Sequence, residues 1–223
     1  MIGLVTIGQA PRNGIVASMF PPSTVPPLAE TGALDGLTRN EIDDLRPDAD
    51  EHLLVTRLGD GREVTVSRQR VIPLMQRAID RVEAMSVSVI CVLCTGTFEG
   101  LVANTPLVFP DRVLRGVVDG IAPSGTLGVL MPHVAQHEFM LAKWQRPGRS
   151  VVTGATSPYA DGADHRSAAA SLVGRGAELI VMDCMGFDRA MQSIVRREVG
   201  VPVVLSNALL GAVLLETFGR GGD

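Results

Sequence analysis

Apolar and polar residues follow two different periods along the chain, and the change of period marks the predicted elements. Apolar positions alternate with polar ones across residues 52–67, on both sides of Gly59-Asp60-Gly61, which predicts a β-hairpin. In residues 68–85 the apolar positions instead share one helical face, and Ser67 stands where a helix cap is expected. Residues 87–94 are apolar on both faces, as in a buried strand of a parallel sheet.

Strand and helix signals alternate over the rest of the chain. A first strand is predicted over 2–8, a Pro-rich loop over 21–27, and a helix over 37–47 with Thr38 and Glu41 at capping-box spacing. In the second half, the predicted helices span 111–122, 134–144, 163–176, 187–200 and 207–219, and the predicted strands span 125–132, 150–154, 177–184 and 201–206. This alternation predicts an α/β fold with mostly parallel sheets. The tail, residues 219–223, is expected to fray.

The composition narrows the class of protein. Hydrophobic residues make up 46% of the 223 residues and charged residues 20%, which favours a packed core over disorder. A net charge of -4 and only 4% aromatic residues argue against a nucleic-acid partner. No apolar run reaches the roughly 18 residues of a membrane span, and the first residues lack the basic start of a signal peptide. Three cysteines do not suggest a disulfide framework, so we expect a cytoplasmic protein with free thiols.

Two short segments carry the candidate chemistry. In "VICVLCTGTFEG" and "LIVMDCMGFDRA" an apolar run ends at a cysteine, Cys94 in the first and Cys184 in the second, with a glycine and a phenylalanine close behind. Ligands of parallel sheets bind beyond the carboxyl ends of the strands. Both cysteines stand there, and so do Gly8 to Arg12 after the first strand and Ser206-Asn207 after the last. Arg12 is well placed to pair with a carboxylate of a ligand.

The same segments resemble a known family. "VLCTGTFEG" and "VMDCMGFD", with "IGLVTIGQAPR" at the start and "VPVVLSNALL" near the end, are similar to the AroM family, which is itself similar to the aspartate/glutamate racemase superfamily. The likeness covers essentially the whole chain. It implies two pseudo-symmetric α/β domains with a cleft between them, here residues 1–108 plus 206–223 and residues 109–205. It also implies a small carboxylate as the ligand, and neither a metal nor a cofactor.

The resemblance implies a role for each cysteine. One thiolate removes the proton from the α-carbon while the other thiol protonates the opposite face, which makes Cys94 and Cys184 the expected catalytic pair. The residues expected to bind the substrate are Gln9, Arg12, Thr95, Gly96, Thr97, Met185, Gly186, Phe187, Ser206 and Asn207. Backbone N–H groups at a helix N-terminus lower the pKa of a thiol and hold anions. We therefore expect both cysteines at strand-to-helix turns that lower their pKa values.

Departures from the racemase pattern keep other functions open. Classical amino-acid racemases carry Asn-Thr after the first cysteine and Thr after the second, where this chain has Thr-Gly-Thr and Met-Gly-Phe. Asp183 and Asp188 are candidates to replace the missing polar groups. The main expectation is a cofactor-independent racemase-like or epimerase-like isomerase. The alternatives are a non-catalytic small-anion-binding sensor or accessory protein, and a single-cysteine decarboxylase or cis–trans isomerase. Whether the chain forms a homodimer is left open.

Other reactive residues have simpler interpretations. Cys91 and Cys94 are spaced as C-x-x-C, but Cys91 lies within a predicted strand and is expected to fill core. His133 and His137 have the spacing of a two-histidine metal site on a helix, but no third ligand has an obvious place beside them. A solvated or capping role is expected for both histidines. Trp144 is expected on the buried face of its helix.

Overall fold

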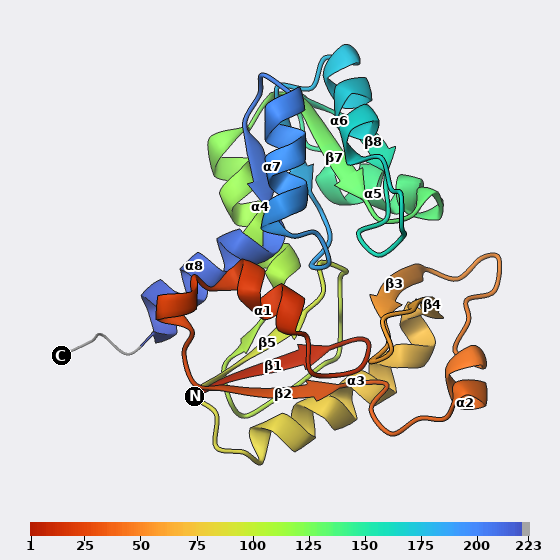
Figure 1. Cartoon of the computed structure of the whole chain (residues 1–223), viewed down its shortest axis with the longest axis vertical. Coiled ribbons are helices and arrows are strands. Elements are labelled where there is room, and N and C mark those ends of the chain that lie inside the picture. The colour runs from red at the N-terminus through yellow and green to blue at the C-terminus, as the bar shows by residue number, and fades with distance from the viewer. Residues whose placement is uncertain (220–223) are drawn as a thin grey trace.

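Two four-stranded parallel sheets organise the chain, as the computed structural model shows for residues 1–219 (Figure 1). The first has the order β2-β1-β5-β6, and the second has the order β10-β9-β7-β8. The strands of the first sheet are β1 (Ile2–Thr6), β2 (Leu28–Gly32), β5 (Val89–Leu93) and β6 (Leu107–Val108). Those of the second are β7 (Gly125–Met131), β8 (Arg149–Ala155), β9 (Leu179–Met182) and β10 (Val203–Leu205). The predicted α/β class is therefore confirmed.

Helices cover both faces of each sheet, which is why the central strands are apolar throughout. They are α1 (Asn13–Met19), α3 (Arg68–Glu83), α4 (Pro110–Ile121), α5 (His137–Trp144), α6 (His165–Gly174), α7 (Arg189–Glu198) and α8 (Ser206–Phe218). In β5, Ile90 and Val92 join the core beside α3, while Cys91 and Leu93 join the core beside α1 and α8. Cys91 thus fills core, as expected.

We call the parts of the chain built on the first and second sheets the first and second lobes. A hairpin stands apart from both sheets and contacts the second lobe. It consists of β3 (Leu53–Arg57) and β4 (Glu63–Ser67), paired antiparallel as predicted. Ser67 accepts a hydrogen bond from the backbone N–H of Arg70 and so caps α3, again as predicted. The Leu53 carbonyl of the hairpin accepts a hydrogen bond from Gln136, at the start of α5. The hairpin therefore forms part of the contact between the two lobes.

Of the elements in the first fifty residues, α2 (Arg39–Asp43) was predicted from the sequence and α1 and β2 were not. The predicted capping box is present at α2, where Thr38 and Glu41 bond each other reciprocally. The sequence patterns did not predict α1 or β2. The Pro-rich segment includes a single 3-10 turn, η1 (Pro22–Thr24), and β2 begins directly after it. The chain therefore returns to the first sheet directly after the predicted loop, in a segment for which no element was predicted.

The predicted domain boundaries remain predictions. The two sheets fall within residues 2–108 and 125–205, and α8 packs against both α1 and α4. The tail that was expected to fray lies, from residue 220 onward, outside the described residues. Among residues 1–219, no helix has both the length and the apolar character needed to cross a membrane.

Candidate active site

One small cavity lies where the two sheets and the hairpin meet. It is lined by Arg12 from the loop after β1, by Cys94 after β5 and by Cys184 after β9. Its volume of about 30 Å³ is enough for about two water molecules. A larger groove of about 500 Å³ lies outside it, and Arg12 and Tyr159 border both spaces. The inner cavity is therefore narrow, and the outer groove adjoins it.

The two cysteines share one local geometry. The Cys94 sulfur accepts a hydrogen bond from the backbone N–H of Gly96 at 3.2 Å, and the Cys184 sulfur accepts one from Gly186 at 3.4 Å. A Cβ on Gly186 would lie 2.2 Å from the Tyr159 hydroxyl oxygen, so a larger residue in the second turn would displace the tyrosine ring. Cys94, Cys184 and Gly96 all line the inner cavity, whereas Gly186 lines the outer groove.

The thiols are less acidic than the sequence suggested. Burial raises the pKa of Cys94 to about 12 and that of Cys184 to about 11. The expected strand-to-helix turn is present at Cys184, which lies between β9 and α7, but it is absent at Cys94, which lies between β5 and β6. Residues 95–106 form a loop that leads from Cys94 to β6, and α7 begins only at Arg189. With no helix N-terminus directly at either sulfur, desolvation outweighs the backbone N–H bonds that favour the thiolates.

Arg12 carries a buried positive charge into the cavity. Its guanidinium donates hydrogen bonds to the hydroxyl oxygens of Thr6 at 3.2 Å, Thr56 at 3.4 Å and Tyr159 at 3.0 Å. Arg12 is only 8% exposed, and among residues 1–219 no carboxylate pairs with its guanidinium. The nearby Glu30 carboxylate bonds the Arg12 backbone instead. A buried cation whose partners are all neutral favours an anionic ligand.

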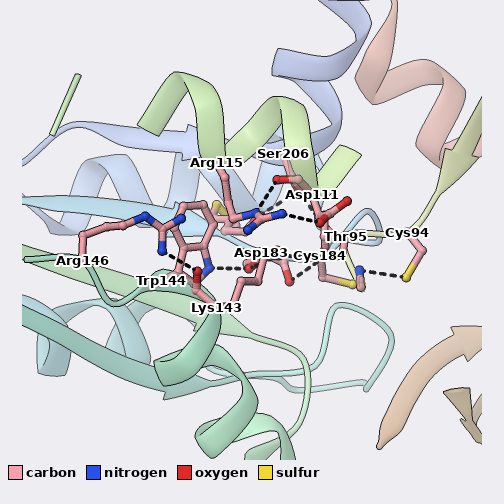
Figure 2. A network of polar contacts seen from close by, with 12 residues as sticks. Cys94, Thr95, Asp111, Arg115, Lys143, Trp144, Arg146, Asp183, Cys184 and Ser206 are labelled. Atoms are coloured by element: carbon pink, nitrogen blue, oxygen red, sulfur yellow. Dashed lines mark hydrogen bonds and ion pairs between the residues drawn. The ribbon is translucent and has the colours of Figure 1, made fainter. Parts of the chain in front are cut away.

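A buried ion pair between Lys143 and Asp183 connects the two cysteine turns (Figure 2). Lys143, the only lysine in the sequence, donates from Nζ to both carboxylate oxygens of Asp183, at 2.9 and 2.8 Å, and to the Thr95 carbonyl at 2.7 Å. Trp144 Nε1 donates to the same carboxylate at 2.7 Å. Thr95 follows Cys94 and Asp183 precedes Cys184, so one ammonium group holds both turns. The Asp183 carboxylate is occupied by these donors.

Some of the expected substrate-binding residues line the cavity, and others lie outside it. Arg12, Thr95, Gly96 and Met185 line the cavity. The Ser206 hydroxyl instead donates to the carbonyls of Met182 and Cys184, and the Asn207 amide donates to those of Met185 and Phe187. These two side chains therefore support the Cys184 turn from α8.

The remaining candidates have structural contacts away from the cavity. The Thr97 carbonyl accepts a hydrogen bond from Arg68, and Phe187 is buried in the core beside α6 and α7. Gln9 bridges the Leu34 carbonyl and the Gly59 N–H, so it holds the hairpin. Asp188 accepts from the Met191 N–H and caps α7.

The two histidines outside the cavity show no sign of a metal site. His133 accepts a hydrogen bond from the Ala135 N–H, which is a capping role, and His137 bonds the Thr153 hydroxyl. The part of the chain that the structure describes contains no group of three residues able to hold a metal ion.

The cavity residues that were not expected from the sequence include His52, Gln136, Phe139 and Tyr159. Each lies on a segment whose position depends on how the hairpin packs against the second lobe. Of these four, only Tyr159 could have been found from the composition: it is the single tyrosine in the chain, and a tyrosine hydroxyl usually takes part in a hydrogen bond.

The fold is that of aspartate/glutamate racemase-like proteins, as a comparison with solved structures shows. Unliganded arylmalonate decarboxylase is 14% identical, with a TM-score of 0.62 over 100% of this chain and 94% of the other. Glutamate racemase from Francisella tularensis subsp. tularensis SCHU S4 in complex with D-glutamate is 11% identical, with a TM-score of 0.60 over 100% and 83%. Picrophilus torridus aspartate racemase is 10% identical, with a TM-score of 0.59 over 100% and 96%.

The family itself follows from the sequence. The family model described as "AroM protein" matches residues 2–218, so the chain belongs to the AroM family. No curated protein matches the chain.

Proposed function

We propose that this protein is a cofactor-independent isomerase of the racemase or epimerase kind, acting on a small carboxylate through Cys94 and Cys184. One observation carries the proposal: both thiols and the Arg12 guanidinium, which has no acidic partner among the described residues, line the same cavity. An inverting proton transfer needs one acid and one base on opposite faces of a carbon, and an anionic substrate needs a cation to hold it.

We infer the order of the proton transfers from the charges around the thiols. Burial raises the pKa of both thiols, and the positive charge of Arg12 opposes this rise at Cys184 as that of Lys143 does at Cys94. Cys184, with the lower pKa, is the thiol that ionises first and removes the α-proton. The Cys94 S–H then delivers its proton to the opposite face, which leaves Cys94 as the thiolate. Arg12 holds the carboxylate on which negative charge develops in between.

The second candidate is an anion-binding protein without catalysis. The observation that favours it is the raised pKa of both cysteines, because thiols with pKa values of about 11 and 12 are protonated at neutral pH. Single-cysteine chemistry, as in a decarboxylase or a cis–trans isomerase, is an intermediate case in which only one of the two thiols is needed.

Inversion and proton exchange at the α-carbon distinguish these functions. Purified protein is incubated with single enantiomers of amino acids and 2-substituted small acids in deuterated water. The α-proton is followed by NMR, and the enantiomers are separated by chiral chromatography. We expect inversion to fall by about 10²- to 10⁴-fold in both Cys94→Ser and Cys184→Ser. Cys91→Ala is the matched control, because Cys91 is buried outside the cavity.

The outcomes separate the three cases. Loss of turnover in only one of the two cysteine variants favours single-thiol chemistry. Binding without exchange, unchanged by either substitution, favours the sensor and overturns the isomerase. Arg12→Ala is expected to weaken carboxylate binding by about tenfold or more in every case, since it removes a charge-assisted hydrogen-bond donor.

A further inference from the structure

The start of α5 places an unsatisfied acceptor in the inner cavity. Gln136 is 6% exposed and lines the cavity, and its Nε2 donates to the Leu53 carbonyl at 3.2 Å. A carbonyl only accepts, so this bond fixes which end of the amide is nitrogen. The buried Oε1 atom accepts no hydrogen bond from any residue in 1–219. Such an atom calls for a donor from a ligand or a water.

His52 stands beside this acceptor and is neutral. It lines the same cavity, its ring contacts Phe139 edge to face at 4.0 Å, and its buried Nε2 has no partner within the described chain. Burial, together with the positive charges of Arg68 and Lys143, lowers the pKa of His52 to about 4. The same positive charges oppose a cationic ligand group at this end of the cavity.

The hairpin sets the distance between this pair and Arg12. Gln136 bonds the backbone of Leu53 at the first residue of β3, and Arg12 bonds the side chain of Thr56 three positions later. Three residues of strand span about 10 Å. The β3 wall of the cavity therefore has a cationic end at Arg12 and a neutral polar end at Gln136 and His52.

The geometry points to a second subsite in this cavity, in which Gln136 Oε1, with the neutral His52 ring lining the same end, accepts a hydrogen bond from a neutral donor on the far side of the ligand from its carboxylate. This inference deepens the proposed function, on which it rests for the place of the carboxylate at Arg12. It selects monocarboxylates with a neutral amide or hydroxyl group. A second carboxylate would face the Gln136 oxygen with no proton to give it, and an alkyl group would leave that oxygen unpaired.

Three anions of similar size test the subsite: malonamate, malonate and isovalerate, which end in an amide, a carboxylate and two methyl groups. Their affinities for the full chain are measured by isothermal titration calorimetry. We expect malonamate to bind about fivefold more tightly than isovalerate, as one net hydrogen bond provides. Malonate should bind most weakly. Equal affinities, tighter binding of malonate, or no binding of any of the three would overturn the subsite.

Variants of Gln136 assign the preference to this side chain. Gln136→Leu should abolish the preference for malonamate over isovalerate, and its melting temperature shows whether it folds. Gln136→Glu keeps the shape of the side chain, so it replaces the leucine variant if that variant does not fold. It should weaken the binding of all three anions. A preference that survives both substitutions would contradict the assignment. Selective binding of malonamate without α-proton exchange would support the subsite and contradict the isomerase function. Exchange that is fastest for malonate would support the isomerase function and contradict the subsite.

Discussion

The turns that carry Cys94 and Cys184 are alike in their backbones and different in their surroundings. Each sulfur accepts an N–H from the glycine two residues later. The Cys184 turn is held by Ser206 and Asn207 of α8 and feels the charge of Arg12, whereas the Cys94 turn leads into a loop and is held through Thr95 by Lys143. The local sequence therefore determines where each thiol stands, and long-range contacts determine how acidic it is.

The largest expected effect comes from removing the ammonium that both turns share. Lys143→Met leaves the Asp183 carboxylate buried without a counter-charge, which costs about 3–5 kcal/mol of folding free energy. Urea denaturation measures the loss. The double variant Lys143→Met with Asp183→Asn removes the stranded charge, so it should be more stable than the single variant. A single variant within about 1 kcal/mol of the natural chain would show that the pair does not hold the turns together.

The two glycines compare the turns directly. A Cβ on Gly186 would overlap the Tyr159 hydroxyl at 2.2 Å, whereas on Gly96 the nearest atom is the Leu54 Cδ2 methyl carbon at 3.1 Å. Gly186→Ala should therefore cost about 1–3 kcal/mol, and Gly96→Ala less.

Thermal unfolding of both glycine variants gives the difference. Repeating the measurement in a Tyr159→Ala background should bring the two costs close together, because that change removes the clashing ring. A penalty for Gly186→Ala that persists without the tyrosine ring would point to backbone strain as the cause.

The smallest expected effect is the difference in acidity between the thiols. The pKa of Cys184, about 11, is lower than that of Cys94, about 12, so Cys184 has the larger thiolate fraction at any pH well below both values. Alkylation by iodoacetamide, followed by mass spectrometry between pH 7 and 9.5, should accelerate with pH at both sites and be faster at Cys184. Turnover should rise with pH over the same interval, because the base must be deprotonated.

The variant Arg12→Met sharpens this last comparison. It removes the positive charge that lowers the pKa of Cys184, so the two alkylation rates should approach each other. Faster reaction at Cys94 in the natural chain would reverse the assignment of the base.

What the sequence could predict follows from how local each signal is. The hairpin, the Ser67 cap and the buried β5 strand all depend on neighbouring residues, and all are confirmed. The elements α1 and β2 were missed because the segments that form them lack a clear period and flank a Pro-rich stretch. Cys94, Cys184 and Arg12 were placed at the cavity because strand ends of a parallel sheet converge.

The rest of the site depends on contacts between distant segments. His52 and Gln136 are 84 positions apart in the sequence, and the hydrogen bond between Gln136 and Leu53, which spans 83 positions, brings their segments together. The raised thiol pKa values have the same origin, since burial is a property of the assembled fold. No pattern within one segment of the sequence carries this information.

The placement of Lys143 has a practical consequence for chemistry done on the whole molecule. Its side chain is 1% exposed, and the chain contains no other lysine. Amine-directed cross-linkers and dyes therefore find no lysine on the outside of the folded protein. Isotope-labelled lysine would give a single ammonium signal in an NMR spectrum, and that signal would report from the joint between the two lobes.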